Sequence, residues 1–172
     1  MLAITVDRFD LQLLKEVQQN GQATNQELGK IVHLSTSQVS RRIVRLQDAG
    51  IIDHYCAVIE PAVVGLDVVA FTEVSLDRHN LSASDGFEQA VAQLPQVLEC
   101  YTLAGQADYL LRVIVPDLAG FSDFMMKELL RIPGVSNARS TITLRRIKHT
   151  NVLPLDHLRT PKTSTTRIQF GT

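Results

Sequence analysis

The sequence predicts an α+β protein of two domains, because the spacing of its apolar residues changes once along the chain. Up to residue 53, apolar side chains recur every three or four positions, which is the helical period. From residue 67 onward, short apolar runs typical of strands alternate with helical stretches. Of the 172 residues, 45% are hydrophobic. Each domain can therefore bury a core of its own.

Two short helices joined by a tight turn are predicted between residues 24 and 50. Each begins with a capping box, in which a hydroxyl residue at the helix start is followed three positions later by Glu or Gln: Thr24 with Glu27, and Ser35 with Gln38. An earlier helix, capped by Asp7 and running to Asn20, completes a three-helix unit. A capped helix, a three-residue turn and a second capped helix describe a helix-turn-helix, which places its second helix in the major groove of DNA.

The outer side of that second helix carries the candidate DNA-binding residues. Val39, Ile43 and Leu46 form its inward stripe, so the helical period turns polar and basic side chains outward. Arg binds guanine edges, Gln binds adenine, and Ser and Arg hold phosphates. The predicted DNA-binding residues are Ser37, Gln38, Arg41, Arg42 and Arg45. Of these, Ser37 and Arg42 are expected near phosphates and the others at base edges. The alternative is an ordinary solvated helix face.

Composition and motifs argue against several other classes of protein. The formal net charge is −1, so DNA affinity must come from local clusters of basic residues. Cys56 and Cys100 have no paired metal-ligand spacing, and the histidines are scattered. Nucleotide-binding and nucleophile motifs are missing from the sequence, so we expect no catalytic residue, no metal and no cofactor. Neither a membrane-spanning run nor a signal peptide is found, and we expect a cytoplasmic protein with no membrane partner.

The second half predicts a βαββαβ order. Strands are expected at residues 68–76, 97–103, 109–115 and 135–147, with helices at 85–94 and 118–131. Each helix ends at a proline, Pro95 or Pro133, that precedes a strand beginning with Val. This repeated order is the ferredoxin-like sandwich, in which both helices cover one sheet face. The other face keeps apolar residues, which favours an oligomer interface. A short strand at Tyr55–Ile59 is expected to pair across a two-fold axis.

Five motifs occur in one order across both domains. They are Asp7-x-x-Asp10, Leu34-Ser35-x-Ser37-x-Val39-x-x-Arg42-Ile43-x-Arg45-Leu46, Ala49-Gly50-Ile51-Ile52, Gly105-Gln106-Ala107-Asp108-Tyr109-Leu110-Leu111 and Pro133-Gly134-Val135. Over residues 6–153 the chain resembles the Lrp/AsnC family of bacterial and archaeal transcription regulators, also called feast/famine regulators. The resemblance implies an N-terminal DNA-binding domain and a C-terminal domain that binds amino acids and assembles dimers into octamers.

The loop at residues 105–108 is the candidate effector site. Gly105 lets the backbone approach a ligand, and Asp108 could meet an α-ammonium group or orient the loop. Taken without the resemblance, the same residues describe an ordinary turn between strands. The predicted effector-binding residues are Gly105, Asp108, Tyr109, Thr141 and Thr143. The family's loop often reads Gly-Asp-x-Asp, whereas Gln106 replaces the first Asp here. We therefore expect a neutral amino acid rather than a basic one.

The sequence thus predicts a transcription regulator that binds double-stranded DNA and a small amino acid, as a homodimer that the family resemblance extends to an octamer. We divide the chain into a helix-turn-helix domain (1–53), a strand and linker (54–66), a ferredoxin-like effector-binding and oligomerisation domain (67–153) and a C-terminal tail (154–172), of which residues 165–170 could form a strand. Two alternatives remain open. One is an amino-acid-binding regulatory subunit of an enzyme, and the other is a ligand-independent architectural DNA-binding protein.

Overall fold

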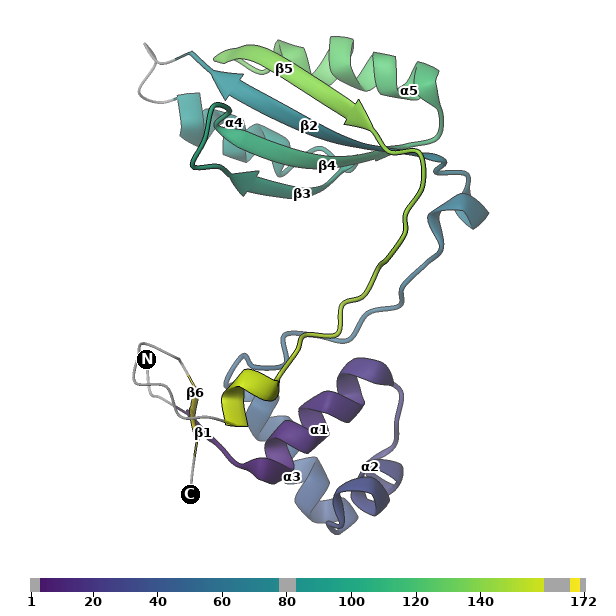
Figure 1. Cartoon of the computed structure of the whole chain (residues 1–172), viewed down its shortest axis with the longest axis vertical. Coiled ribbons are helices and arrows are strands. Elements are labelled where there is room, and N and C mark those ends of the chain that lie inside the picture. Colours follow the sequence, from purple (N-terminus) through teal and green to yellow (C-terminus); the bar gives the residue numbers. More distant parts are fainter. Residues whose placement is uncertain (1–3, 78–82, 160–167, 171–172) are drawn as a thin grey trace. The chain divides into compact units, whose positions relative to one another are not determined.

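The computed structural model describes residues 4–77, 83–159 and 168–170, and the chain forms two compact units (Figure 1). The helical unit combines the residues up to Ala57 with those from Lys148 onward. The sheet unit comprises Val58–Ile147. The chain therefore passes from one unit to the other twice, and each unit is described by itself.

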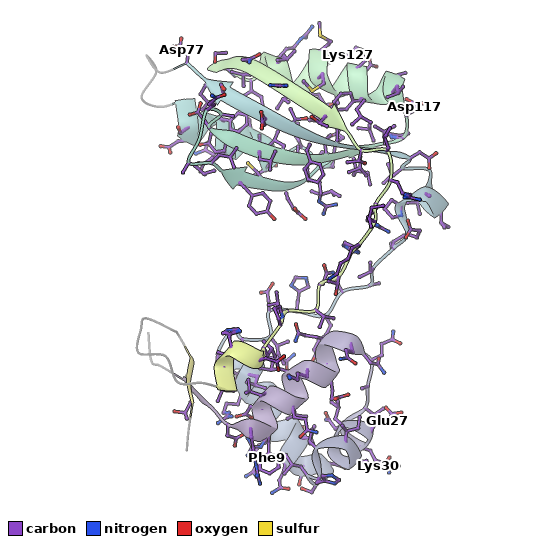
Figure 2. The ribbon with its side chains drawn as sticks, in the orientation of Figure 1. Phe9, Glu27, Lys30, Asp77, Asp117 and Lys127 are labelled. Atoms are coloured by element: carbon purple, nitrogen blue, oxygen red, sulfur yellow. The ribbon has the colours of Figure 1, made fainter. Side chains whose placement is uncertain are left out.

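The helical unit is built on α1 (Arg8–Gln19), α2 (Asn25–Val32) and α3 (Thr36–Asp48). Each helix begins with a complete capping box, so the two boxes read from the sequence are confirmed and Asp7 with Asp10 adds a third. Figure 2 labels Glu27, the carboxylate of the α2 box. His33 ends α2 with a φ of 56°, a left-handed conformation that turns the chain into α3. The three predicted helices are confirmed.

One core joins the three helices of this unit. Its fully buried side chains come from every helix and include Leu13, Leu28, Val32, Val39 and Leu46. Gly29 has a steric role in this packing, because a Cβ there would lie 2.6 Å from the carbonyl oxygen of Leu34. The close approach at Gly29 is therefore made by the backbone of the turn between α2 and α3.

The C-terminal segment returns to the helical unit. Leu155 and Leu158 pack against its core, and the Lys15 ammonium lies 2.8 Å from the Asp156 carboxylate. The strand β6 (Ile168–Phe170) pairs in parallel with β1 (Ile4–Val6), and Figure 1 labels the two strands beside each other. The expected tail strand is confirmed over its last three residues, and residues 165–167 lie outside the described chain. The strand β1 was not predicted.

The sheet unit contains β2 (Val68–Leu76), β3 (Val97–Thr102), β4 (Tyr109–Val115) and β5 (Val135–Ile142), in the antiparallel order β3-β4-β2-β5. Helices α4 (Ala83–Val91) and α5 (Leu118–Asp123) follow β2 and β4 and lie on one side of the sheet (Figure 1). Phe87, Phe124 and Leu129 pack with Val74 and Leu111 in its core. The α+β class and the βαββαβ order are confirmed.

Several predicted elements differ from the structure in bounds or type, among them the helix expected at 85–94, which lies at Ala83–Val91. The last strand ends at Ile142 and not at 147, because β2, its pairing partner, begins at Val68. The second helix keeps its predicted bounds but changes type, passing from α5 into a π turn (η2, Phe124–Glu128) and a 3-10 turn (η3, Leu129–Arg131). Residues 53–60 form no regular element in the single chain and precede a 3-10 turn (η1, Pro61–Val64). The strand expected at Tyr55–Ile59 needs a second copy as its pairing partner and stays a prediction.

The structure gives a further negative observation about the helices. No helix within the described ranges is both long enough and apolar enough to cross a membrane.

Candidate DNA-binding and effector sites

The exposed face of α3 includes a stripe of three side chains that lies opposite its buried residues. Val39 and Leu46 are fully buried against the other helices, which fixes the opposite side of α3 as the outer one. Ser37, Arg41 and Val44 lie one helical turn apart on this outer side, and all three are exposed. Val44, which is 51% exposed, was not among the predicted DNA-binding residues. Its spacing from Arg41 was the available signal, and an apolar side chain at this position is suited to contact a thymine methyl group.

Arg42 and Arg45 have partners inside the chain. The Nη1 atom of Arg42 lies 2.8 Å from Oδ2 of Asp7 and 2.7 Å from Oδ1 of Asp10. The Nη2 atom of Arg45 lies 2.5 Å from Oδ2 of Asp10. The Asp10 side chain is fully buried, whereas those of Arg42 and Arg45 are 25% and 47% exposed. Sequence reasoning marked both arginines for DNA without detecting that α1 supplies carboxylates to them.

These ion pairs shift the ionisation of their members. Burial alone would raise the pKa of the Asp7 carboxyl, but hydrogen bonds from the Asp10 backbone and from Arg42 outweigh it and lower that pKa. Burial likewise opposes the charge on Arg42, yet Asp10 and Asp7 raise the pKa of its guanidinium. That guanidinium also lies 5.5 Å from the ring centre of Phe9, which Figure 2 labels. Arg42 is therefore held as a cation against the first turn of α1.

Gln38 and Arg41, the other two predicted DNA-binding residues with long polar side chains, differ in whether contacts within the chain already occupy them. Oε1 of Gln38 accepts hydrogen bonds from the backbone N–H of Ser35 at 3.0 Å and from its hydroxyl at 3.1 Å. Bidentate binding of adenine uses both the oxygen and the amino group of Gln. Because the helix cap already occupies the Gln38 oxygen, Gln38 is not free for this contact. Arg41, in contrast, is exposed and forms no ion pair with any residue that the structure describes.

In the sheet unit, Asp108 ties the 105–108 loop to two neighbouring strands. Its Oδ2 accepts a hydrogen bond from the Leu76 N–H at 2.7 Å. Its own N–H donates to the Val74 carbonyl at 3.0 Å, and its carbonyl accepts from the Leu103 N–H at 2.8 Å. Gly105 lies in open space, because a Cβ there would meet no atom within 4 Å. The chain itself therefore leaves room at Gly105 for a ligand or a second subunit.

Tyr109 faces the helix-covered side of the sheet. Its side chain is 4% exposed, its hydroxyl donates to Oε1 of Glu88 at 2.8 Å, and its ring centre lies 4.7 Å from that of Phe87. Burial, followed by the hydrogen bond to Glu88, raises the pKa of its phenol. Tyr109 also lines a groove of about 410 Å³ with Val91 and Cys100. This groove lies along β3 and α4.

Thr141 and Thr143 are placed at the opposite end of the sheet from Asp108. Thr141 pairs with Phe71 on the face that the helices leave open, and the Thr143 hydroxyl donates to the Val69 carbonyl at 3.1 Å. Val69 and Val74, which bond Thr143 and Asp108, are five positions apart on β2, or roughly 17 Å at about 3.4 Å per residue. One amino acid cannot contact both groups within a single chain, so a shared site would need a second copy.

The comparisons with known proteins cover both units. Residues 6–47 match the AsnC-type helix-turn-helix domain, and residues 69–153 match the Lrp/AsnC ligand binding domain. The leucine-responsive regulatory proteins of Klebsiella pneumoniae and Escherichia coli are each 34% identical to this chain over 148 residues, which is 86% of this chain and 90% of theirs.

Solved structures agree with these sequence matches. A transcriptional regulator from Neisseria meningitidis, in complex with L-methionine, is 42% identical with a TM-score of 0.87, over 90% of this chain and 99% of that one. An AsnC family transcriptional regulator from Agrobacterium tumefaciens is 32% identical with a TM-score of 0.83, over 88% and 99% of the two chains. These relatives are transcriptional regulators and not enzymes. The chain therefore belongs to the Lrp/AsnC family of helix-turn-helix transcriptional regulators.

Proposed function

We propose that this regulator reads DNA through the Ser37, Arg41 and Val44 stripe of α3, and that a small neutral amino acid bound beside the 105–108 loop, where subunits meet, controls its assembly. The observation that carries the DNA part is the exposed Arg41, whose charge has no ion-pair partner among the described residues. A guanidinium in this state can bind guanine without first breaking an internal contact. Arg45 keeps about half of its side chain exposed, but its guanidinium is paired with Asp10.

Substitution of Arg41 tests the DNA contact. Loss of one bidentate base contact costs about 1–3 kcal/mol and relaxes specificity at one position of the site. Binding isotherms of Arg41→Ala on duplexes selected from a random pool by the wild-type protein measure both effects. Arg131→Ala is the matched control, because it removes the same charge from the sheet unit. Wild-type affinity and sequence preference in Arg41→Ala would contradict the assignment.

The effector proposal combines the open space at Gly105 with the charge of the loop. Gln106 contributes no negative charge where the family often has Asp, so nothing in this position selects a basic side chain. The Neisseria relative was solved with a neutral amino acid, L-methionine. Asp108 serves in this proposal to orient the loop, because its carboxylate already accepts the Leu76 N–H.

Calorimetry with methionine, leucine and lysine tests the effector proposal. We expect the neutral amino acids to bind more tightly than lysine. Gly105→Leu should fold normally, because nothing in the chain lies within 4 Å of its Cβ, yet it should abolish binding. Gly86→Leu is the matched control, since a Cβ at Gly86 also meets nothing within 4 Å. If none of the three amino acids binds at millimolar concentration, the effector proposal is wrong.

We further propose a homodimer that covers the open sheet face and assembles into larger rings. Phe71 and Tyr101 lie on that face and are 40% and 54% exposed, around the Arg112–Glu99 ion pair. Aromatic side chains of this exposure are typical of subunit contacts. A ligand held between subunits shifts assembly by mass action and so changes DNA binding at a distance. Light scattering of wild type and Phe71→Asp decides this, because a stable wild-type monomer would contradict it.

A further inference from the structure

A carboxylate that never reaches the protein surface lies where α1 meets α3. The Asp10 side chain is fully buried and accepts three hydrogen bonds. One comes from the Asp7 N–H at 3.0 Å, and the others come from the guanidinium groups of Arg42 and Arg45. A buried carboxylate is stable only with such partners, because an unpaired charge pays the full cost of desolvation. Asp10 therefore cannot release both arginines at once.

We propose that Asp10 is a positioning residue that sets the DNA specificity of this regulator without touching DNA, by holding Arg42 and Arg45 away from indiscriminate phosphate contact and fixing the rotation of α3. The inference rests on the proposed DNA contact of α3. Arg42 and Arg45 lie one helical turn apart and are anchored to the same carboxylate. Two anchors on one side of a helix prevent it from turning about its axis. Ser37, Arg41 and Val44 are thereby kept on the outer side.

The ion pairs also divide the arginines of α3 into two that are paired with carboxylates and one, Arg41, that has no ion-pair partner among the described residues. Three arginines are available on this helix, and Asp7 and Asp10 neutralise Arg42 and part of Arg45. Sequence-independent affinity grows with the number of phosphates that free cations neutralise, at about 0.9 in the salt slope for each. Base contacts, and not phosphate contacts, discriminate between sequences. Withdrawing two arginines from the phosphates therefore lowers the affinity for all DNA while the readout through Arg41 persists.

An Asp10→Asn variant of the full chain separates this role from a structural one. Asn keeps the size of the side chain but removes its charge and presents an amino group toward the guanidinium donors. We expect both arginines to become available to phosphates. The slope of log K against log salt should steepen by about 1–2, at about 0.9 for each phosphate gained. The ratio of affinities for a wild-type-selected duplex and a shuffled duplex of the same composition should fall at least tenfold.

Two controls make these readouts specific. Asp123→Asn causes the same change in net charge at an exposed i,i+4 pair with Lys127 in the sheet unit, and it should keep the wild-type slope and ratio. A purely structural role of Asp10 would reduce the fraction of protein that binds, measured by stoichiometric titration, and leave the slope and ratio of the active fraction unchanged. That outcome, or a wild-type slope and ratio in fully active Asp10→Asn, overturns the inference.

A second variant keeps the inference testable if Asp10→Asn does not fold. Asp7→Asn removes one of the two carboxylates that bind Arg42 and leaves Asp10 in place. It should steepen the slope by up to about 1, and an unchanged slope overturns the inference. Failure of the underlying proposal looks different, because Arg41→Ala would then keep the wild-type affinity for both the selected and the shuffled duplex.

Discussion

In the helical unit, three ion pairs connect α3 to the first turn of α1, whereas in the sheet unit backbone hydrogen bonds around one carboxylate hold the 105–108 loop. The first arrangement depends on side chains that also have the chemistry to bind DNA. The second uses the backbone and leaves Gly105 in open space. The difference teaches that neighbouring residues of the same type can have opposite roles on α3, while the 105–108 loop depends on one side chain, Asp108, and tolerates changes at Gly105.

The largest expected effect separates two adjacent arginines. Arg42→Ala should lower the free energy of unfolding by about 3 kcal/mol, because it removes a partner of a fully buried carboxylate. Arg41→Ala, one position earlier and exposed, should change it by no more than about 0.5 kcal/mol. Urea unfolding followed by circular dichroism measures both. Equal effects of the two substitutions would remove the distinction between the structural and the reading arginine.

A smaller effect is expected in the sheet unit. Asp108→Ala leaves the Leu76 N–H without its acceptor, and an unsatisfied, partly buried donor costs about 1–3 kcal/mol. Gly105→Ala in the same loop should be nearly neutral, because its Cβ enters open space. Thermal unfolding of the two variants compares a residue that holds the loop with one that does not. A neutral Asp108→Ala would show that backbone bonds alone suffice.

Two glycines within helices should respond with opposite signs. Gly29→Ala gains up to about 1 kcal/mol of helix propensity but forces a Cβ to within 2.6 Å of the Leu34 carbonyl oxygen. Overpacking of this kind costs about 1–3 kcal/mol, so we expect a net loss of about 1 kcal/mol. Gly86→Ala in α4 meets nothing and should gain up to about 1 kcal/mol. Chemical denaturation of the matched pair checks both signs, and a stabilised Gly29→Ala would contradict the close contact.

The smallest effect concerns pH, and it has opposite directions in the two units. The lowered pKa of Asp7 means that its contribution to stability is present above the unfolded value of about 3.9 and is lost as pH falls through the folded value. The raised pKa of Tyr109 means that its contribution is present below about 10 and is lost as pH rises toward the folded value. The test is the melting temperature of each variant as a function of pH. Asp7→Asn should flatten the acid side of this curve, and Tyr109→Phe should flatten its alkaline side. An unchanged acid side in Asp7→Asn would contradict the first assignment.

Local features of the fold could be predicted because their causes lie within a few residues. The capping boxes at Thr24 and Ser35 satisfy helix N–H groups with side chains three positions away. Both helical segments of the sheet unit end before a proline, at Val91 ahead of Pro95 and at Arg131 ahead of Pro133. The bounds of β2 and β4 followed from apolar runs alone. Local patterns could not decide whether residues 55–59 form a strand or where the last strand ends, because a strand exists only where a partner strand lies beside it.

The candidate sites show the same division. By itself the sequence determined that α3 would be capped, amphipathic and rich in arginine, and that a Gly and Asp loop would join two strands, since composition and period decide these properties. Only the tertiary structure decided that Asp7 and Asp10 bind Arg42 and Arg45, that Val44 is exposed beside Arg41, and that Asp108 lies far from Thr143 along β2. The physical reason is distance along the chain. Ion pairs across about 35 positions and contacts across a sheet depend on how elements pack, which no local pattern records.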